Sequence, residues 1–317
     1  MLLSDLRKAV RRIGDEETMA DSRKKMLFIY NPKAGKAGIK SKLSDILEIF
    51  TKNGYEILVH PTLERGDACR ITEERAKDYS LVVCSGGDGT LDEVVTGMIK
   101  GGVKTPVGYI PAGSTNDFGG SLGLPKNLIS AAKIAVTGKN FACDVGGFNQ
   151  DVFVYIAAFG LFTEVSYETD QQMKNVLGHM AYLLEGVKSL QNIRTYRMKV
   201  RYDGKEIEDD FIYGMVTNSF SVGGFKSITG KNVKLDDGLF EVTLIKSPRN
   251  PMELNDIRIS LLNRDINSER MYCFAASRLE IETTEPVAWT LDGEFGGEHT
   301  CVVINNLNKG MEIRVAE

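Results

Sequence analysis

A glycine-rich turn around a single acid, residues 85–90 (SGGDGT), is the segment of this sequence best suited to chemistry. It follows a short apolar run at residues 81–84 and precedes a helical pattern at residues 91–99. Glycines let a phosphate chain approach the backbone, and the N–H groups at the start of a helix bind anions. Asp88 has the wrong charge to bind phosphate directly, so we expect it to act through a metal ion or water. A plain glycine-rich turn is the alternative.

Two further glycine-bearing loops follow apolar runs in the same way. Residues 31–36 (NPKAGK) follow the run at 26–30, and residues 111–118 (PAGSTNDF) follow the run at 107–110. If these runs are parallel strands of one sheet, the loops meet at its carboxyl edge, where ligands of open α/β sheets bind. Together the three loops predict a phosphate site. No Walker A sequence is present and no Gly-x-Gly-x-x-Gly opens the first helix, which disfavours a P-loop enzyme and a Rossmann dehydrogenase.

Two Asp-Gly pairs in the second half of the chain supply further carboxylates, at residues 236–238 (DDG) and 292–294 (DGE). Asp-Gly is a common hairpin turn, and that is the alternative interpretation for both pairs. The second pair lies between two apolar segments, WTL and FGG. Phosphoryl transfer needs a carboxylate that can take the proton of the acceptor hydroxyl. Asp292 and Glu294 are candidates for that role.

The elements that must position these residues differ between the two halves of the chain. In residues 25–140, short apolar runs alternate with helical patterns, which predicts an α/β domain with a mostly parallel sheet. The pattern in residues 141–317 predicts an antiparallel β-sandwich with a helical insertion. Whether the last strand returns to the first domain is left open. Residues 1–24 form an N-terminal extension with the spacing of an amphipathic helix. In the second half, one strand is expected at 152–159 and helices are expected at 173–190 and 251–262.

Composition limits the function further. The 317 residues carry 39 basic and 43 acidic side chains, a net charge of −4, which argues against a nucleic-acid partner. Five isolated cysteines argue against a disulfide framework or a zinc site and favour a cytoplasmic location. No apolar run approaches the length of about 18 residues that a transmembrane helix needs.

In their order along the chain, these motifs resemble those of the diacylglycerol-kinase catalytic family of soluble lipid kinases, which includes bacterial lipid kinases and sphingosine kinases. The resemblance rests on NPKAG, GGDGT, PAGSTND, LDDG and LDGE, and it spans residues 26 to about 300. GGDGT alone is shared with NAD kinases, but the full set is far more specific. The resemblance implies ATP- and Mg²⁺-dependent transfer of the γ-phosphoryl group to a lipid hydroxyl, with diacylglycerol as the first candidate. It also implies an ATP cleft between the two domains, with lipid entering the sandwich.

The resemblance also implies roles for individual residues. Glu294 and Asp292 resemble the region that supplies the catalytic base in the family, and Asp88 is expected beside the phosphates. Asp237, with the backbone carbonyls of Lys234 and Leu239, resembles the family's structural magnesium site, and Asp144 resembles the acid that links that site to the cleft. A separate magnesium ion is expected to bridge the ATP oxygens, with Asp88 helping to hold it. The residues that match ATP contacts are Asn31, Pro32, Lys33, Ala34, Gly35, Thr62, Gly86, Gly87, Asp88, Gly89, Thr90, Leu91, Asp92, Glu93 and Ser114. Two positions depart from the family pattern, because Ser114 stands where Thr is usual and Asp92 stands where Asn is common.

A lipid substrate implies a membrane surface as partner and a cytoplasmic, peripherally membrane-associated enzyme. Because the net charge is negative, attraction to anionic lipid must be local. Two segments could supply it: the basic side of the N-terminal helix, and the alternating cations Arg197, Lys199 and Arg201. A homodimer is left open. The rival functions are a soluble-substrate kinase of the NAD-kinase type and a non-catalytic, nucleotide-binding membrane-docking protein.

Overall fold

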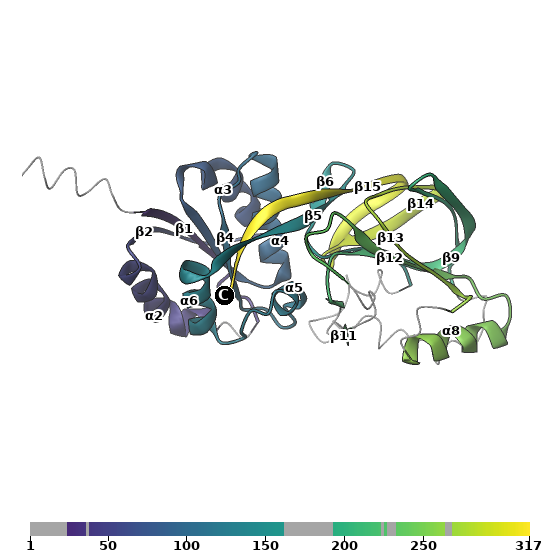
Figure 1. Cartoon of the computed structure of the whole chain (residues 1–317), viewed down its shortest axis with the longest axis horizontal. Coiled ribbons are helices and arrows are strands. Elements are labelled where there is room, and N and C mark those ends of the chain that lie inside the picture. The colour runs from purple at the N-terminus through teal and green to yellow at the C-terminus, as the bar shows by residue number, and fades with distance from the viewer. Residues whose placement is uncertain (1–23, 36–37, 162–192, 223–224, 227–232, 264–267) are drawn as a thin grey trace, which may run out of the picture.

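A computed structural model describes residues 24–35, 38–161, 193–222, 225–226, 233–263 and 268–317. The helices expected within residues 1–24 and at 173–190 lie outside this part of the chain. The described residues form two bodies side by side, an α/β body from the first half and a β-rich body from the second (Figure 1).

The first body is built on four neighbouring strands in the order β4-β3-β1-β2. The bounds are β1 Lys24–Tyr30, β2 Tyr55–Pro61, β3 Leu81–Gly86 and β4 Val107–Pro111. All three pairings are parallel, with Met26 opposite Leu81 and Val82 opposite Val107 in register. Helices cover both faces, which is why β3 and β4 are apolar along almost their whole length and buried throughout.

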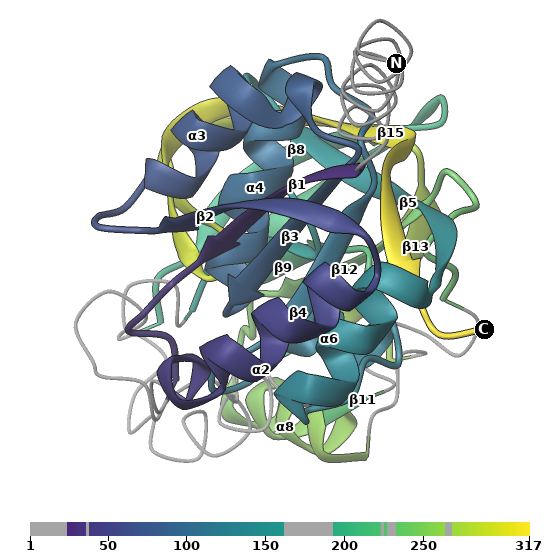
Figure 2. The same cartoon turned by 90° about the vertical axis from the view of Figure 1, so that its left-hand side faces the viewer.

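Two helices pack on each face of this sheet (Figure 2). One face carries α2 (Ile39–Lys52) and α6 (Leu128–Thr137), and the other carries α3 (Asp67–Arg75) and α4 (Asp88–Lys100). Each helix has an apolar stripe toward the sheet; in α2 it includes Ile46 and Phe50, and Phe50 meets Phe28 edge to face at 5.3 Å. The short helices η1 (Ala76–Asp78) and α5 (Asp117–Ser121) follow α3 and β4. This packing fixes the carboxyl ends of β1, β3 and β4.

The second body is antiparallel. Its strands are β6 Asp151–Phe153, β7 Ile156–Gly160, β8 Tyr196–Tyr202, β9 Lys205–Thr217, β12 Phe240–Lys246, β13 Met271–Ala276 and β14 Arg278–Leu291, with the two-residue strands β10 Ser221–Val222 and β11 Phe225–Lys226 beside them. The long strands β9 and β14 each pair with β8 along one stretch and with β7 along another, so they pass between the layers of the sandwich. A core that includes Phe159, Leu244 and Trp289 fills the interior. Helix α8 (Pro251–Asn263) confirms the helix expected at 251–262.

Two long strands join the bodies. β5 (Lys139–Phe148) leaves the first body, and β15 (Glu294–Val315) runs antiparallel beside it back from the second (Figure 1). At Ile313, β15 pairs in parallel with Val107 of β4. The final strand therefore returns to the first sheet, and the sheet is continuous through both bodies.

One expected strand is divided. The segment expected at 152–159 forms β6 and β7, with Val154 and Tyr155 between them. The backbone N–H groups at this break do not join a strand ladder but bind the carboxylate of Asp292. Alternation of side chains cannot reveal such a break, because it arises from a distant residue.

Candidate active site

A cavity of about 530 Å³ opens where β1, β3 and β4 end, and Glu294 of β15 reaches it from the second body. Its lining unites the three loops that the sequence singled out. The lining residues are Asn31, Lys33, Ala34, Gly35, Thr62, Leu63, Glu64, Arg65, Gly87, Gly89, Thr90, Asp92, Glu93, Gly113, Ser114 and Glu294. The sequence therefore located the cavity, although several expected residues lie elsewhere.

Glycines let the three loops approach one another closely. A Cβ on Gly35, whose φ is +54°, would lie 2.4 Å from the carbonyl oxygen of Ala112. A Cβ on Gly113 would lie 2.5 Å from the Cα of Gly87. Gly87, which lines the cavity, is also the N-cap of α4. Because glycine has no side chain, no side-chain cap occupies the first N–H groups of that helix. Backbone N–H groups and a helix N-terminus together suit a phosphate chain.

Asp88 begins α4 between two glycines that line the cavity. Its Oδ2 accepts the backbone N–H of Asp117 at 3.0 Å, whereas its buried Oδ1 accepts no hydrogen bond from the described residues. Burial raises the pKa of Asp88 to about 7, and the negative charges of Asp117 and Asp292 act in the same direction. A carboxyl held in this state suits a residue that meets a cation or a water when substrate binds.

Asp292 is buried, and protein donors occupy its carboxylate. Its oxygens accept the N–H groups of Val154 at 2.6 Å, Tyr155 at 2.9 Å and Ile156 at 2.9 Å. Its φ of +51° places it in the left-handed region at the β14–β15 turn. Burial raises the pKa of Asp292 to about 6, and the three N–H donors oppose that rise. Asp292 thus anchors the turn that presents Glu294, and it is poorly placed to take a substrate proton itself.

Glu294 is the carboxylate of the DGE motif that lines the cavity. Its side chain is 54% exposed, and Oε2 lies 3.6 Å from a guanidinium nitrogen of Arg65. Its Oε1 would lie 3.7 Å from a Cβ on Gly89, so it faces the first turn of α4. Glu294 therefore stands beside the place that suits phosphate, with one oxygen paired to an exposed cation.

Other expected nucleotide contacts have structural partners. Both oxygens of Glu93 accept N–H groups at the start of α3, from Gly66 at 2.8 Å and from Ala68 at 3.1 Å. Glu93 thereby holds the segment that carries Thr62 to the cavity wall. Leu91 is fully buried in the core, and Pro32 and Gly86 support the loops without lining the cavity.

The residues expected around magnesium lie apart from this cavity. Asp144 is fully buried, and its oxygens accept the N–H groups of Gly238 and Lys309, each at 2.7 Å, and the side-chain amides of Asn306 and Asn308. Asp237 is exposed, and its Oδ1 accepts the N–H of Leu239 at 3.1 Å. Among the described residues, no three His, Cys, Asp or Glu side chains are grouped to hold a metal. A site of one carboxylate and the carbonyls of Lys234 and Leu239 would not form such a group.

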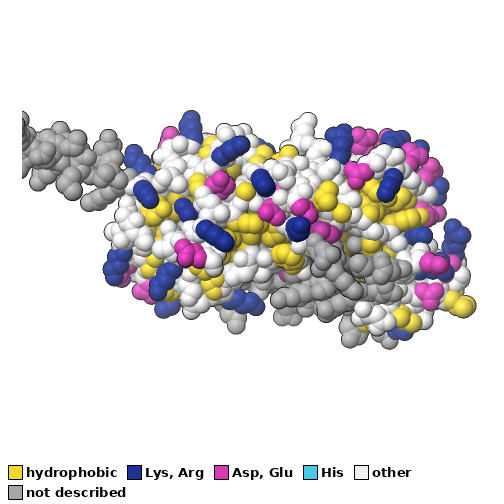
Figure 3. Space-filling model, in the orientation of Figure 1, with side chains coloured by type: hydrophobic (Ala, Val, Ile, Leu, Met, Phe, Trp, Pro, Cys, Tyr) yellow, Lys and Arg dark blue, Asp and Glu magenta, His cyan; other side chains and the backbone are white. Residues whose placement is uncertain are grey.

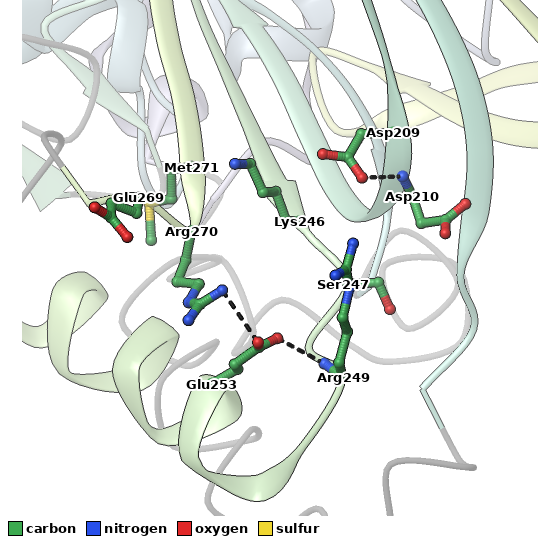
Figure 4. A pocket seen from close by; sticks show the side chains of 9 residues that line it. All are labelled: Asp209, Asp210, Lys246, Ser247, Arg249, Glu253, Glu269, Arg270 and Met271. Atoms are coloured by element: carbon green, nitrogen blue, oxygen red, sulfur yellow. Dashed lines mark hydrogen bonds and ion pairs between the residues drawn. The ribbon is translucent and has the colours of Figure 1, made fainter.

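A second cavity of about 540 Å³ lies at the far end of the sandwich, between β9, β12, β13 and α8 (Figure 4). Its lining is polar, with acids and bases from β9, β12, β13 and α8. Glu253 meets the guanidinium of Arg270 at 3.2 Å and the backbone N–H of Arg249 at 2.8 Å. It contains none of the glycine-rich loops, so the first cavity is the better candidate.

Comparison with known proteins finds matches to both halves of the chain. The diacylglycerol kinase catalytic domain matches residues 25–148, and the YegS C-terminal NAD kinase beta sandwich-like domain matches residues 156–309. Diacylglycerol kinase of Bacillus subtilis (strain 168) is 33% identical over 276 residues, which is 86% of this chain and 91% of that protein. That of Staphylococcus carnosus (strain TM300) is 33% identical over 297 residues, 92% of this chain and 95% of that protein.

The chain belongs to the diacylglycerol kinase family. A crystal structure of a diacylglycerol kinase from Bacillus anthracis (strain Sterne) has 27% identity and a TM-score of 0.73, over 93% of this chain and 97% of that one. The predicted resemblance and the two-domain order are thus confirmed, and the protein is a lipid kinase.

Sequence reasoning missed some lining residues of this kinase. Leu63, Glu64 and Arg65 form one wall of the cavity together with Thr62. The only available signal was their place directly after a strand, β2, whose carboxyl end lies beside that of β1. Gly113 was within a loop that the sequence singled out, yet its contact with Gly87 depends on how two loops meet.

The basic strand β8 does not form the free cationic surface that the sequence suggested. Arg197 pairs with Glu208 at 3.0 Å, Lys199 with Glu206 at 3.0 Å and Arg201 with Glu282 at 2.7 Å. Acidic and basic side chains are accordingly interspersed over the sandwich end of the kinase (Figure 3). In the part of the chain described, no helix is long and apolar enough to cross a bilayer. Docking at a membrane surface stays a prediction.

Proposed function

We propose that this lipid kinase transfers the γ-phosphoryl group of ATP to the free hydroxyl of diacylglycerol, with Mg²⁺, and so makes phosphatidic acid. The observation that carries the proposal is the cavity itself. Its glycine-rich walls and the open N-terminus of α4 suit a triphosphate, and one half-exposed carboxylate, Glu294, faces them from the other body. The names of the similar proteins support diacylglycerol as the acceptor.

The nucleotide would be held mainly by backbone. The N–H groups of Gly87 and Gly89 and the loops at Gly35 and Gly113 would surround the phosphates, and Lys33 lines the same cavity as a cation. Little covalent chemistry is asked of the protein in phosphoryl transfer, so positioning and charge stabilisation supply most of the rate.

Glu294 would act on the acceptor. The lipid hydroxyl oxygen forms a bond to the γ-phosphorus while the bond from that phosphorus to the β–γ bridging oxygen breaks, and ADP leaves. The hydroxyl proton passes to Glu294. The guanidinium of Arg65, which lines the same cavity, lies 3.6 Å from the Glu294 carboxylate.

Two exposed apolar residues suit a lipid acceptor. Leu63 lines the cavity and is 80% exposed, and Phe295, the residue after Glu294, is 48% exposed. We propose that the acyl-bearing end of the substrate lies against them.

Magnesium would neutralise phosphate charge when bound. Asp88, which begins α4 beside the cavity, would offer such an ion a buried carboxylate oxygen that receives no hydrogen bond from the described residues. A second, structural magnesium ion would be held apart from the cavity, where Asp237 and the carbonyls of Lys234 and Leu239 are all oxygen ligands. Asp144 would stabilise the Asp237 loop through its bond from Gly238.

The test is transfer of label from γ-³²P-ATP in parallel reactions with diacylglycerol, other lipid alcohols and NAD, each with magnesium and with a chelator. The proposal expects labelled phosphatidic acid that disappears on chelation. Labelled NADP would instead favour a soluble-substrate kinase of the NAD-kinase type, the alternative suggested by the name of the matched C-terminal domain. Absence of label from every lipid would contradict the proposal.

A further inference from the structure

The loop after β2 carries an arginine to the cavity. Arg65 lines the cavity, and its guanidinium lies 3.6 Å from the carboxylate of Glu294. The other oxygen of Glu294 lies 3.7 Å from the place that a Cβ on Gly89 would occupy, in the first turn of α4. Arg65 is therefore within reach of the helix N-terminus where the phosphates of ATP are proposed to lie.

The backbone around Arg65 is held, although its side chain is open to solvent. The N–H of Leu63 donates to the carboxylate of Asp67 at 3.0 Å. The N–H of Gly66 donates to the carboxylate of Glu93 at 2.8 Å. The Arg65 side chain itself is 68% exposed. The loop thus fixes where the arginine stem begins, while the long stem lets the guanidinium change partner.

The pairing of Arg65 with Glu294 is easily exchanged. A separation of 3.6 Å is too long for a hydrogen bond, and both side chains are more than half exposed. Ion pairs this exposed contribute little to stability, because water screens the two charges. Arg65 can therefore leave Glu294 when a stronger anion enters the cavity.

The charges of the cavity call for a cation at the phosphates. In the part of the lining that the structure describes, the cations are Lys33 and Arg65 and the acids are Glu64, Asp92, Glu93 and Glu294. A triphosphate adds further negative charge to a lining in which acids already outnumber cations. Arginine suits a phosphoryl group better than lysine does, because its planar fork donates two parallel N–H groups to two oxygens.

We propose that Arg65 is a further catalytic residue: when ATP binds, its guanidinium leaves Glu294 and donates hydrogen bonds to oxygens of the γ-phosphoryl group. There it stabilises the negative charge of these oxygens while the bond to the β–γ bridging oxygen breaks and the bond to the acceptor oxygen forms. Its departure frees Glu294 to take the hydroxyl proton, and Arg65 itself exchanges no proton. The inference rests on the proposed function for ATP as donor, but not for the identity of the acceptor.

Equilibrium binding of ATP and of ADP, each with magnesium and without lipid, tests the contact apart from activity. Titration calorimetry compares wild type, Arg65→Ala, Arg65→Lys and the control Arg75→Ala, since Arg75 is an exposed arginine at the end of α3 and does not line the cavity. Arg65→Ala should weaken ATP relative to ADP by about tenfold or more, because only ATP has the γ oxygens that the guanidinium meets. Arg65→Lys should be intermediate, and Arg75→Ala should match wild type. Equal changes for the two nucleotides, or no change, would overturn the proposal.

A second set of titrations separates contact with phosphate from a role exerted through Glu294. Glu294→Gln is compared with the double variant that also carries Arg65→Ala. The proposal expects Arg65→Ala to weaken ATP relative to ADP by a similar factor with and without the Glu294 carboxylate. If that effect vanishes once Glu294 is replaced, Arg65 acts only through Glu294 and the proposal is wrong.

The rate of transfer tests the catalytic role. At saturating ATP, Arg65→Ala should lower kcat by about 100-fold or more, while its KM for diacylglycerol stays near that of wild type. A wild-type kcat for Arg65→Ala would contradict a contact with the transferred group. Failure to label any lipid would refute the proposed acceptor instead, and the nucleotide titrations would still decide the role of Arg65.

Discussion

Replacement of Asp88 by Asn should stabilise the folded protein at alkaline pH while abolishing its activity. Asp88 has a pKa of about 7 in the folded chain because it is buried beside Asp117 and Asp292. The folded state therefore holds this proton more tightly than the unfolded state does. For a carboxyl whose pKa is raised on folding, stability is highest below the unfolded pKa and falls as pH rises through the folded one. Asn cannot ionise and escapes that loss.

The size of the effect follows from the pKa of Asp88 in the two states. With about 3.9 unfolded and about 7 folded, ionisation costs the folded wild type about 4 kcal/mol at pH 8 and about 1.5 kcal/mol at pH 5. The advantage of Asp88→Asn should thus grow by about 2.5 kcal/mol between these pH values. Any constant effect of the amide on hydrogen bonding cancels in that difference. Activity should fall by about 100-fold or more, as for other charge-stabilising groups.

Urea unfolding of wild type and Asp88→Asn at pH 5 and pH 8, without nucleotide or metal, measures the change. Asp78→Asn is the matched control, because Asp78 is exposed and should give no pH-dependent difference. A stability difference that does not grow with pH would show that Asp88 is not desolvated as described. An active Asp88→Asn enzyme would remove Asp88 from the reaction.

Two further substitutions test other parts of the site. Gly113→Ala should lower the free energy of unfolding by about 1–3 kcal/mol and reduce activity, because its Cβ would meet the Cα of Gly87 at 2.5 Å. Gly120→Ala is the control, since a Cβ there has open space and should change neither quantity. Equal melting temperatures and activities for the two variants would refute the close approach of the loops. Asp237→Ala should abolish any rise in melting temperature on adding magnesium, since it removes the one proposed carboxylate ligand; an undiminished magnesium-dependent rise would place the metal elsewhere.

The position of the cavity could be predicted because it follows from the strand pattern. Residues 26–30, 81–84 and 107–110 are short apolar runs, and three such runs separated by helices give parallel strands whose carboxyl ends share an edge. Any glycine-rich loops after them must therefore meet. Glu294 could be predicted from its Asp-Gly turn, although the sequence could not separate its role from that of Asp292.

The parts that escaped prediction depend on contacts between distant residues. Asp292 is held by N–H groups of residues 154–156, more than 130 positions earlier in the chain. Glu93 is occupied by the start of α3, and the cations of β8 are paired by acids that strand register brings opposite them. A pattern along one segment indicates which face a side chain occupies, but it does not identify the partner across the fold.

The most direct test of the proposed chemistry is the rate of phosphatidic acid formation by Glu294→Gln, with Glu298→Gln as an exposed control on the same strand β15. At saturating ATP and with diacylglycerol in mixed micelles, Glu294→Gln should lose about 100-fold or more in kcat while its affinity for ATP stays near that of wild type. Glu298→Gln should match wild type in both quantities. A Glu294→Gln enzyme that forms phosphatidic acid at the wild-type rate would contradict the assignment of this cavity as the site of transfer.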